Sequence, residues 1–561
     1  MIKKLLLPLL LLISFFVHAE TLKTDVLVIG GGPCGVAAAV QSARSRVKTM
    51  LIEPGPWLGG SMTMGGMCVL DANRDLSSGI WGEFRRKVTE YYRNRLGYDT
   101  TKIAILRFEP YTGAEILKKI TDTVKNLTVK LNTPWTGIRK DGDGWEVEIK
   151  VNGETVKVKA KVVVDGTPTG EVAAKAGAKF DDGTGDSEGM MTEIAILKDY
   201  GRNTDKTIAK PAGYDPAAYA FLKGRDIQKM LKTDAIPNDK YMIDWTEPNR
   251  ETGIAKQQTL GLVYYLQTEL GHKNLGLDDQ FGTADHLPRV SFIKQGAHTV
   301  GAVRMVEDDI LKPYDRESRL YRTSIGVGSI AGTPPFSIPL GAIVPKNTDN
   351  LLVTENALSV TGDVNSKTID PAVQMTLGQG VGATAAYCAF FKTTTKHLNV
   401  RIIQGEIMDF KGYLMPFTDV PQSDPHWRAI QQIGATGMLK GIRTEKGNTI
   451  EVHFEPNDTV RTAEVKPFLN EIYTRAFLWF SNQKPGKYLT LGNLLYFISD
   501  YTLTDPETLE PQIRKIWSTQ LHLPGELDVK RPATRLEFAM LINKYLNPFG
   551  KTVDLTGKVV N

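Results

Sequence analysis

The sequence predicts an α/β protein that opens with a βαβ unit, carries an inserted mixed α+β domain and ends in a helical module. Two observations support this fold class. Strand and small-residue helix patterns alternate over residues 25–53, and the composition changes after about residue 400. The 561 residues, 41% of them hydrophobic, have an ordinary globular composition. At about 100–200 residues per domain, this length accommodates two to four domains.

The amino terminus has the features of a secretory signal peptide over residues 1–19. Lys3 and Lys4 precede an apolar stretch over residues 5–17, and Ala19 ends a small-residue cleavage pattern. The stretch is shorter than the roughly 20 residues that span a membrane. We therefore expect an exported, periplasmic or extracellular protein with no transmembrane segment after signal removal. A buried first helix is the alternative interpretation.

Charge and cysteine content argue against several classes of function. The 68 Lys and Arg residues nearly balance the 63 Asp and Glu residues, and they do not form long basic runs. Nucleic-acid binding needs clustered positive charge, so we expect no nucleic-acid partner. Three cysteines are too few for a disulfide scaffold or a four-cysteine metal site. The chain also lacks paired C-x-x-C and H-x-x-x-H motifs, so we expect no metal site.

Residues 25–53 form the first segment that carries chemistry. A β-branched run over residues 25–29 predicts a buried strand, and the alanine-rich run 36–43 predicts a helix packed closely on it. A second strand is expected over residues 47–52, and it ends at Glu53. This order of elements is a βαβ unit, which is the frame of dinucleotide-binding sites.

A glycine-rich loop joins the first strand to the helix. Gly30, Gly32 and Gly35 have the spacing G-x-G-x-x-G, with Pro33 and Cys34 between them. Gly30 permits the tight turn, Gly32 lets the backbone approach a pyrophosphate, and Gly35 allows close helix packing. The helix amino terminus then presents free N–H groups and a positive dipole end to phosphates.

The acidic residue at the end of the second strand narrows the choice of cofactor. Glu53 is placed to accept hydrogen bonds from both hydroxyls of a ribose. A carboxylate there would repel a 2′-phosphate, which argues against NADP. From these residues alone, NAD and FAD both remain open.

The segment after Glu53 resembles a known family. Pro54, Gly59, Gly60 and Ser61 are similar to the stretch that continues along FAD in the glutathione-reductase-like flavoprotein superfamily. Within it, the chain resembles the FAD-dependent oxidoreductase family that includes xanthan-lyase-like members. The resemblance implies FAD as the cofactor and places residues 65–67 beside the isoalloxazine ring.

Two later segments extend the resemblance. Asp165, Gly166 and Thr167 lie in a strand-and-loop segment that the family uses next to the cofactor. Residues 350–386 are similar to the strand and small-residue helix that close the family's FAD site, and there Asp363 is implied as a cofactor ligand. Glu355 stands in this segment where the family usually has Gly.

The resemblance also implies the division into domains. A Rossmann-like FAD-binding domain is expected from two parts, residues 20–185 and residues 336–395. An inserted mixed α+β substrate domain would span residues 186–335. Alternating apolar residues between positions 130 and 165 predict antiparallel strands within the first part.

The last part of the chain, residues 410–550, is similar to a degenerate surface-layer-homology module. Segments 417–420, 426–430 and 461–464 follow the order of that repeat, and residues 533–541 repeat its ending. The resemblance implies binding to a cell-wall or surface glycan. The alternative is a helical accessory domain that packs on the enzyme.

Candidate catalytic residues come from the resemblance as well. His298 and Arg304 lie in a segment that corresponds to the family's strand reaching the flavin pocket. His298 could act as a general base, and Arg304 is suited to hold a carboxylate. A structural, hydrogen-bonded histidine is the alternative.

Together these observations predict an exported FAD-dependent oxidoreductase that transfers a hydride from a small organic or carbohydrate-like substrate to flavin. Two alternatives belong to other classes. One is a cell-surface glycan-binding protein, and the other is a non-redox lyase built on a flavoprotein-like scaffold.

Overall fold

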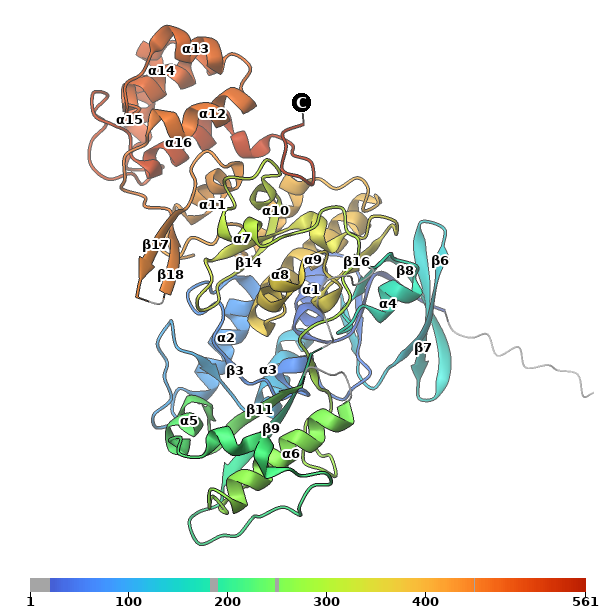
Figure 1. The fold of residues 1–561 in the computed structure, drawn as a ribbon. Coiled ribbons are helices and arrows are strands. Elements are labelled where there is room, and N and C mark those ends of the chain that lie inside the picture. The colour runs from blue at the N-terminus through green and yellow to red at the C-terminus, as the bar shows by residue number, and fades with distance from the viewer. Residues whose placement is uncertain (1–20, 182–189, 248–251, 448, 561) are drawn as a thin grey trace, which may run out of the picture.

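A computed structural model describes residues 21–181, 190–247, 252–447 and 449–560. The predicted signal peptide, residues 1–19, lies outside the described residues. Figure 1 shows a central body built on one large sheet, with a second sheet and its helices at one end. The C-terminal helices, orange to red, form a lobe at the opposite end.

The large sheet has the order β5-β2-β1-β8-β7-β6. β7 pairs with the first part of β8, and β16 pairs with its carboxyl end, residues 163–165. Its parallel strands are β1 (Thr21–Ile29), β2 (Thr49–Ile52), β5 (Leu127–Lys130), β8 (Glu154–Asp165) and β16 (Leu351–Val353). The antiparallel strands predicted between positions 130 and 165 are β6 (Trp135–Asp141), β7 (Gly144–Val151) and the first half of β8. The predicted α/β fold with a parallel sheet is therefore confirmed.

Strand register places the functional loops together. Ile29 lies beside Ile52 on one side and beside Asp165 on the other, and Asp165 also pairs with Val353. The carboxyl ends of β1, β2, β8 and β16 thus meet at one edge of the sheet. Ligands of open α/β sheets bind at such an edge.

Two small-residue helices pack against each other beside this sheet. α1 spans Pro33–Arg44 and begins three residues earlier than predicted, because Pro33 suits the first helical position. α9 (Pro371–Phe391) packs on α1, and a Cβ on Gly378 would overlap the backbone of Cys34. Other helices of this body are α2 (Gly79–Tyr92), α3 (Pro110–Asp122), α4 (Glu171–Lys175), α8 (Gly362–Thr368) and α10 (Val400–Asp409).

The second sheet packs against helix α6 (Thr252–Thr268), which Figure 1 shows beside it. Its central strand β9 (Met191–Asp199) sends Ile194 toward the main core and Ala195 toward the cluster that includes residues of α6. The remaining strands are β10 (Ala235–Ile236), β11 (Lys240–Glu247), β12 (Leu275–Leu277) and β13 (Phe292–Ile293), with α5 (Ile227–Thr233) beside them. This sheet falls within the predicted substrate domain, whose boundaries stay a prediction.

The C-terminal part is largely helical. Three segments meet through isolated bridges, Thr459 with Thr534, Arg461 with Tyr488, and Thr490 with Pro532. Thr490 and Thr534 each cap the helix that follows with a capping box. The elements are α11 (Trp427–Thr436), β17 (Ile442–Lys446), β18 (Thr449–His453), α12 (Thr462–Ile472), α13 (Ala476–Gln483), α14 (Leu491–Thr502), α15 (Pro506–Ile516) and α16 (Arg535–Leu546). Its likeness to surface-layer-homology repeats stays a prediction.

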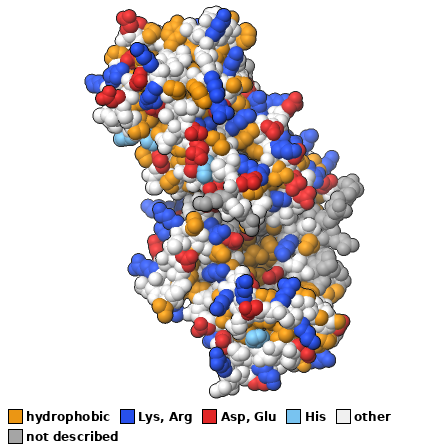
Figure 2. Space-filling view, turned by 60° about the vertical axis from the view of Figure 1, so that its left-hand side comes forward, with side chains coloured by type: hydrophobic (Ala, Val, Ile, Leu, Met, Phe, Trp, Pro, Cys, Tyr) orange, Lys and Arg blue, Asp and Glu red, His pale blue; other side chains and the backbone are white. Residues whose placement is uncertain are grey.

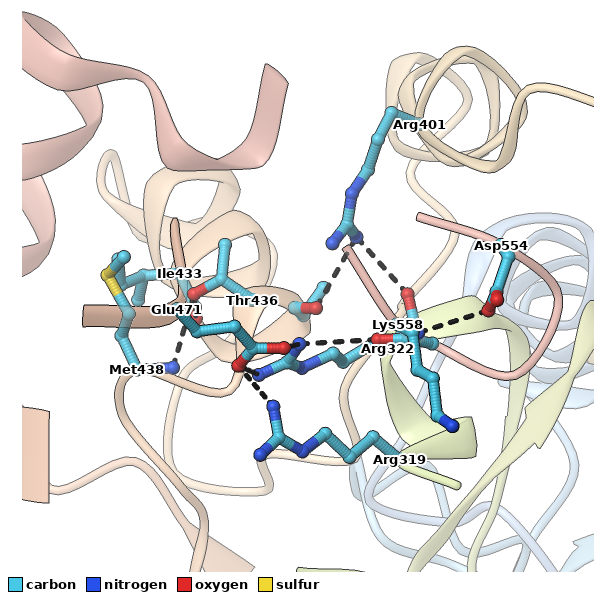
Figure 3. Close-up of polar contacts among 11 residues, drawn as sticks. Arg319, Arg322, Arg401, Ile433, Thr436, Met438, Glu471, Asp554 and Lys558 are labelled. Atoms are coloured by element: carbon cyan, nitrogen blue, oxygen red, sulfur yellow. Dashed lines mark hydrogen bonds and ion pairs between the residues drawn. The ribbon is translucent and has the colours of Figure 1, made fainter. Parts of the chain in front are cut away.

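Buried charges join this part to the body, as Figure 3 shows. Arg322, whose side chain is 1% exposed, pairs with Glu471 of α12 at 2.9 Å, and Arg319 pairs with the same carboxylate. Arg401 of α10 donates to the carbonyl oxygen of Arg322 at 3.1 Å. One hydrophobic cluster runs through both parts, from Val26 to Phe549. The short helix α7 (Asp308–Leu311) precedes Arg319 and Arg322 in the chain, and the strands β14 (Ser324–Gly328) and β15 (Phe336–Pro339) follow them.

The surface carries charges of both signs. On the face drawn in Figure 2, Lys and Arg side chains are interspersed with Asp and Glu along the length of the molecule. Among the described residues, the helices are all too short or too polar to cross a membrane. The remaining short strands, β3 (Val69–Leu70) and β4 (Leu106–Arg107), pair with each other near α2.

Candidate functional site

The candidate site lies where β1, β2, β8 and β16 end. Each strand runs into a loop that carries a residue of interest, and these loops touch one another. Gly166 donates its N–H to the carbonyl oxygen of Ile29 at 2.8 Å, and Thr354 donates its hydroxyl to the carbonyl of Asp165 at 2.8 Å. The predicted glycine loop is therefore enclosed by segments that are far apart in the sequence.

The close approach of two loops explains the first glycine. Gly30 has φ +104°, in the left-handed region, and a Cβ there would overlap the carbonyl group of Gly166. A Cβ on Gly35 would likewise overlap the carbonyl of Gly30. Any side chain at either position would push the strand, the loop and α1 apart.

Backbone alone forms the floor beside the amino terminus of α1. Gly59 donates to the carbonyl oxygen of Gly31 at 2.7 Å, and a Cβ on Gly60 would lie 2.9 Å from the Cα of Gly32. Pro33 has no N–H, and the backbone of the buried Cys34 contributes a hydrogen bond to the Glu355 carboxyl group. The N–H of the residue after Cys34 has no partner within the first turn of the helix, and this bare backbone fits a diphosphate. Ser61 lies beyond this floor and is half-buried.

Glu53 is buried at the end of β2 and holds two backbone segments. Its Oε2 accepts from the N–H of Gly31 at 2.7 Å, and its Oε1 accepts from the N–H of Gly55 at 2.7 Å. Burial raises the pKa of Glu53, and these two hydrogen bonds partly offset that effect. Each oxygen keeps a second lone pair for a ribose hydroxyl. Pro54, the next residue, is exposed.

Asp165 shapes the loop after β8. One carboxylate oxygen accepts from the N–H and hydroxyl of Thr167, at 3.0 and 2.6 Å, and the other accepts from the N–H of Ala173 at 2.7 Å. Burial raises the pKa of Asp165 to about 6. These hydrogen bonds engage the side chains of Asp165 and Thr167 within the protein. The two side chains therefore stabilise the loop that carries Gly166. Asp363, in contrast, lies exposed in the first turn of α8.

The structure adds Glu355 to the residues around the glycine loop. It is 7% exposed, has φ +53°, and its Oε1 would lie 3.0 Å from a Cβ on Gly32. That oxygen has no hydrogen-bond partner among the described residues. Burial raises the pKa of Glu355 to about 8. A backbone hydrogen bond from Cys34 acts in the opposite direction and is the smaller effect. Its only sequence signal is an acidic residue where the resembled family usually has Gly.

His298 and Arg304 lie on one segment but have different surroundings. The Nδ1 of His298 lies 2.8 Å from the carbonyl oxygen of Asn356, just after β16, and the ring is 8% exposed. Burial lowers the pKa of His298. Arg304 forms an ion pair with Asp181 on the surface. Their catalytic roles stay a prediction.

Sequence reasoning missed a polar cluster next to this segment. Lys294 donates to the hydroxyl of Thr246 at 3.0 Å, and Thr246 lies 2.8 Å from the hydroxyl of Thr192 on β9. Asn365 of α8 donates to the carbonyl of Lys294 and to the amide oxygen of Asn356. These residues tie the second sheet to the loop after β16. They come from five separate elements and loops between residues 192 and 365, so sequence spacing carries no signal for them.

Comparisons with known proteins give a family match and a more distant relative. A family model described as "FAD dependent oxidoreductase" matches residues 25–407. The digeranylgeranylglycerophospholipid reductase of Methanocaldococcus jannaschii is 28% identical over 260 residues, which cover 42% of this chain and 61% of the relative. The matched part thus spans about three fifths of that relative's length.

Solved structures are more distant. A geranylgeranyl bacteriochlorophyll reductase-like protein from Thermoplasma acidophilum is 13% identical, with 82% of this chain and all of that chain covered and a TM-score of 0.38. The p-nitrophenol 4-monooxygenase of Pseudomonas putida is 12% identical, with coverages of 73% and 92% and a TM-score of 0.37. These likenesses are too remote to assign residues or substrates.

Proposed function

The chain belongs to the FAD dependent oxidoreductase family, and we propose that it is an exported enzyme that transfers a hydride from a small organic or carbohydrate-like substrate to FAD. The observation that carries the cofactor is the match over residues 25–407, which contains the whole glycine-rich site. The export follows from the amino-terminal sequence pattern of residues 1–19.

The residues at the ends of the parallel strands suit FAD. Gly32 presents backbone without a side chain at the start of α1, while Gly30 and Gly60 let the surrounding loops pack closely around it. Glu53 retains acceptor capacity for the adenosine ribose. When bound, the flavin supplies the redox chemistry by accepting the hydride. The protein's part is to bind, to orient the substrate and to exclude water.

The second sheet is the proposed substrate side. A Cβ on Gly66 would meet Ile194 of β9 at 3.1 Å, so this sheet covers the turn that the resemblance places beside the flavin ring. Lys294 and Thr246 give this side a cation and a hydroxyl. Such groups suit a polar substrate with hydroxyl or carboxylate substituents.

The decisive experiment is the spectrum of the purified protein and its response to reductants. We expect flavin absorbance in the protein as isolated and anaerobic bleaching in stopped flow by one class among sugars, amines and hydroxy acids. A yellow protein that none of these substrates bleaches, but that eliminates from a polysaccharide, would favour the lyase alternative.

A catalytic role for His298 is part of this proposal. His298→Asn should leave FAD bound and lower the rate of flavin reduction by about 10²–10⁴, the usual contribution of a positioned acid–base group. Arg304→Gln is the companion variant and should raise the concentration of a carboxylate substrate needed for half-maximal rate. Unchanged reduction kinetics in His298→Asn between pH 5 and 9 would assign His298 a structural role through Asn356.

A second candidate function is glycan binding by the C-terminal part. A cavity of about 1350 Å³ lies between Arg461 of the repeat-like segment and the body, and Lys440, Tyr314 and Arg316 also line it. The lining also contains the carboxyl groups of Asp315, Glu317, Asp458, Glu464 and Glu471. Aromatic side chains with charged groups of both signs suit the hydroxyl groups of a polysaccharide. We expect residues 410–560 to be needed for sedimentation with cell-wall polysaccharide, whereas flavin binding should depend on the body. Retained sedimentation in Arg461→Ala with Lys440→Ala would argue against this cavity as the site.

A further inference from the structure

Glu355 is an acidic side chain at the place where a dinucleotide-binding protein needs to accept negative charge. Its Oε1 lies next to Gly32, the glycine that opens the loop to a diphosphate. Burial raises the pKa of Glu355, and a smaller, opposite effect comes from a backbone hydrogen bond of Cys34, at the second position of the 12-residue helix α1. The carboxyl group therefore lies at the positive end of the helix.

The position of Glu355 is held from several sides. Its backbone N–H donates to the side chain of Gln374 in α9 at 3.2 Å. The next residue, Asn356, donates to the carbonyl oxygens of Pro168 and Ile293, both at 2.9 Å. These bonds fix the backbone on both sides of a residue with positive φ. The carboxyl group thus has little freedom to withdraw from the loop.

The groups that face Glu355 give it no counter-charge. α1 contributes the thiol of Cys34. Burial raises the pKa of this thiol, and the charge of Glu355 raises it further. Burial and the Cys34 backbone are the causes of the pKa shift of Glu355, and charged side chains are not among them. The carboxyl groups of Glu53 and Asp165, at the ends of β2 and β8, are held by backbone N–H groups, and His298 lies at the carbonyl of Asn356. The described residues form no ion pair with Glu355. An ionised carboxylate would therefore stand unpaired in a buried site beside a diphosphate.

We propose that Glu355 takes part in FAD binding as a neutral carboxylic acid that donates a hydrogen bond to the diphosphate, so that FAD binds the protein only with a proton on this residue. The proposal rests on the FAD binding described above. It explains why Oε1, the atom nearest Gly32, lacks a partner in the protein itself. A protonated carboxyl group has one O–H donor. Because Oε1 has no partner in the protein, a proton on this oxygen is available to a ligand.

The direction of the pH effect follows from the environment. Burial raises the pKa of Glu355 to about 8, so the acid is neutral at pH 7 before FAD binds. A neighbouring diphosphate disfavours the ionised form and raises this pKa further in the complex. FAD affinity should therefore be constant below pH 7 and fall as the pH rises above about 8, by up to tenfold per pH unit for one linked proton.

The test is FAD binding by the apoprotein, measured by quenching of FAD fluorescence between pH 6 and 9.5. The wild type should lose affinity at the alkaline end, whereas Glu355→Gln, which cannot ionise, should bind with the same affinity across the range. Glu171→Gln, an exposed carboxyl at the start of α4, is the matched control and should follow the wild type. Ionisation of FAD itself affects all three proteins alike.

Calorimetry in buffers of different ionisation enthalpy gives a second readout that needs only the wild type. Close to one proton should be taken up per FAD at pH 9, and close to none at pH 6.5. A pH-independent wild-type affinity, or no proton uptake at pH 9, would overturn the role of Glu355 while leaving FAD binding intact. Failure of all three proteins to bind FAD at any pH would overturn the cofactor assignment, and this proposal with it.

Discussion

The junction with the C-terminal helices and the glycine-rich site both bury ionisable side chains, but only the junction supplies a counter-charge. At the junction Arg322 has the Glu471 carboxylate at 2.9 Å and the carbonyl oxygen of Gly557 at 3.2 Å (Figure 3). At the glycine loop Glu355 is also buried, at 7% exposed, and its Oε1 has no partner among the described residues.

The difference separates architecture from binding. The buried Arg322 has its counter-charge within the protein, although its Nε lacks a hydrogen-bond partner among the described residues, so removing Glu471 leaves an uncompensated charge. The buried Glu355 has no counter-charge among the described residues and one oxygen without a partner, so a ligand is needed to complete its hydrogen bonds. We therefore interpret the junction as fixed structure and the loop as the place where a ligand enters.

The largest expected effect is at the junction. Glu471→Gln leaves Arg322 buried without its counter-charge and should cost about 3–5 kcal/mol of unfolding free energy, the range for breaking a buried pair. Denaturant unfolding followed by tryptophan fluorescence measures it. Glu510→Gln, which breaks an exposed pair with Arg514, is the control and should cost less than about 1 kcal/mol.

The same junction should weaken in acid. Burial raises the pKa of Glu471, but the hydrogen bonds and charges of Arg322 and Arg319 outweigh it, and the pKa is lowered in the folded protein. The stabilisation is thus complete above the unfolded pKa of about 4.3 and is lost as the pH falls through the lower folded value. Thermal melts from pH 3 to 7 should show this loss in the wild type and a smaller one in Glu471→Gln.

The next effect concerns Glu53, the carboxyl group at the glycine loop that accepts hydrogen bonds from the protein. Glu53→Ala should weaken FAD binding by about 1.5–3 kcal/mol, the range for hydrogen bonds to a charged group. The variant also frees the N–H groups of Gly31 and Gly55, so FAD affinity and unfolding should be measured together. Unchanged FAD retention would remove Glu53 from the cofactor site.

Gly32→Ala should lower FAD affinity without preventing the chain from folding. The new Cβ meets the flexible end of Glu355 at 3.0 Å, so the chain should still fold, while the approach of the diphosphate is obstructed. We expect FAD affinity to fall by about 1–3 kcal/mol, as for other overpacked sites. Gly405→Ala in α10, where a Cβ meets open space, is the matched control. Equal FAD affinity in both variants would move the diphosphate away from Gly32.

The smallest effect is expected at the surface pair of Arg304 and Asp181. The Arg304 side chain is 46% exposed, and an ion pair in water contributes about 0–1 kcal/mol. Arg304→Gln should therefore leave the unfolding midpoint nearly unchanged. A loss as large as that of Glu471→Gln would mean that exposure does not distinguish these two charge pairs.

The sequence by itself determined the βαβ unit, the positions of its glycines and the antiparallel strands before Asp165. These features depend on steric limits and periodicity within a few tens of residues, which a single stretch of chain displays. Gly30 illustrates this, because its φ of +104° is a local demand that the G-x-G-x-x-G spacing already signals.

Only the tertiary structure decided what completes the site. β16 joins the sheet beside β8, and that pairing carries Glu355 to Gly32 and Asn356 to His298 across long stretches of sequence. The pairing of Arg322 with Glu471 likewise crosses from the body to α12. The physical reason is that the ionisation and role of a buried polar group depend on the atoms that enclose it, and segments distant in the chain supply those atoms.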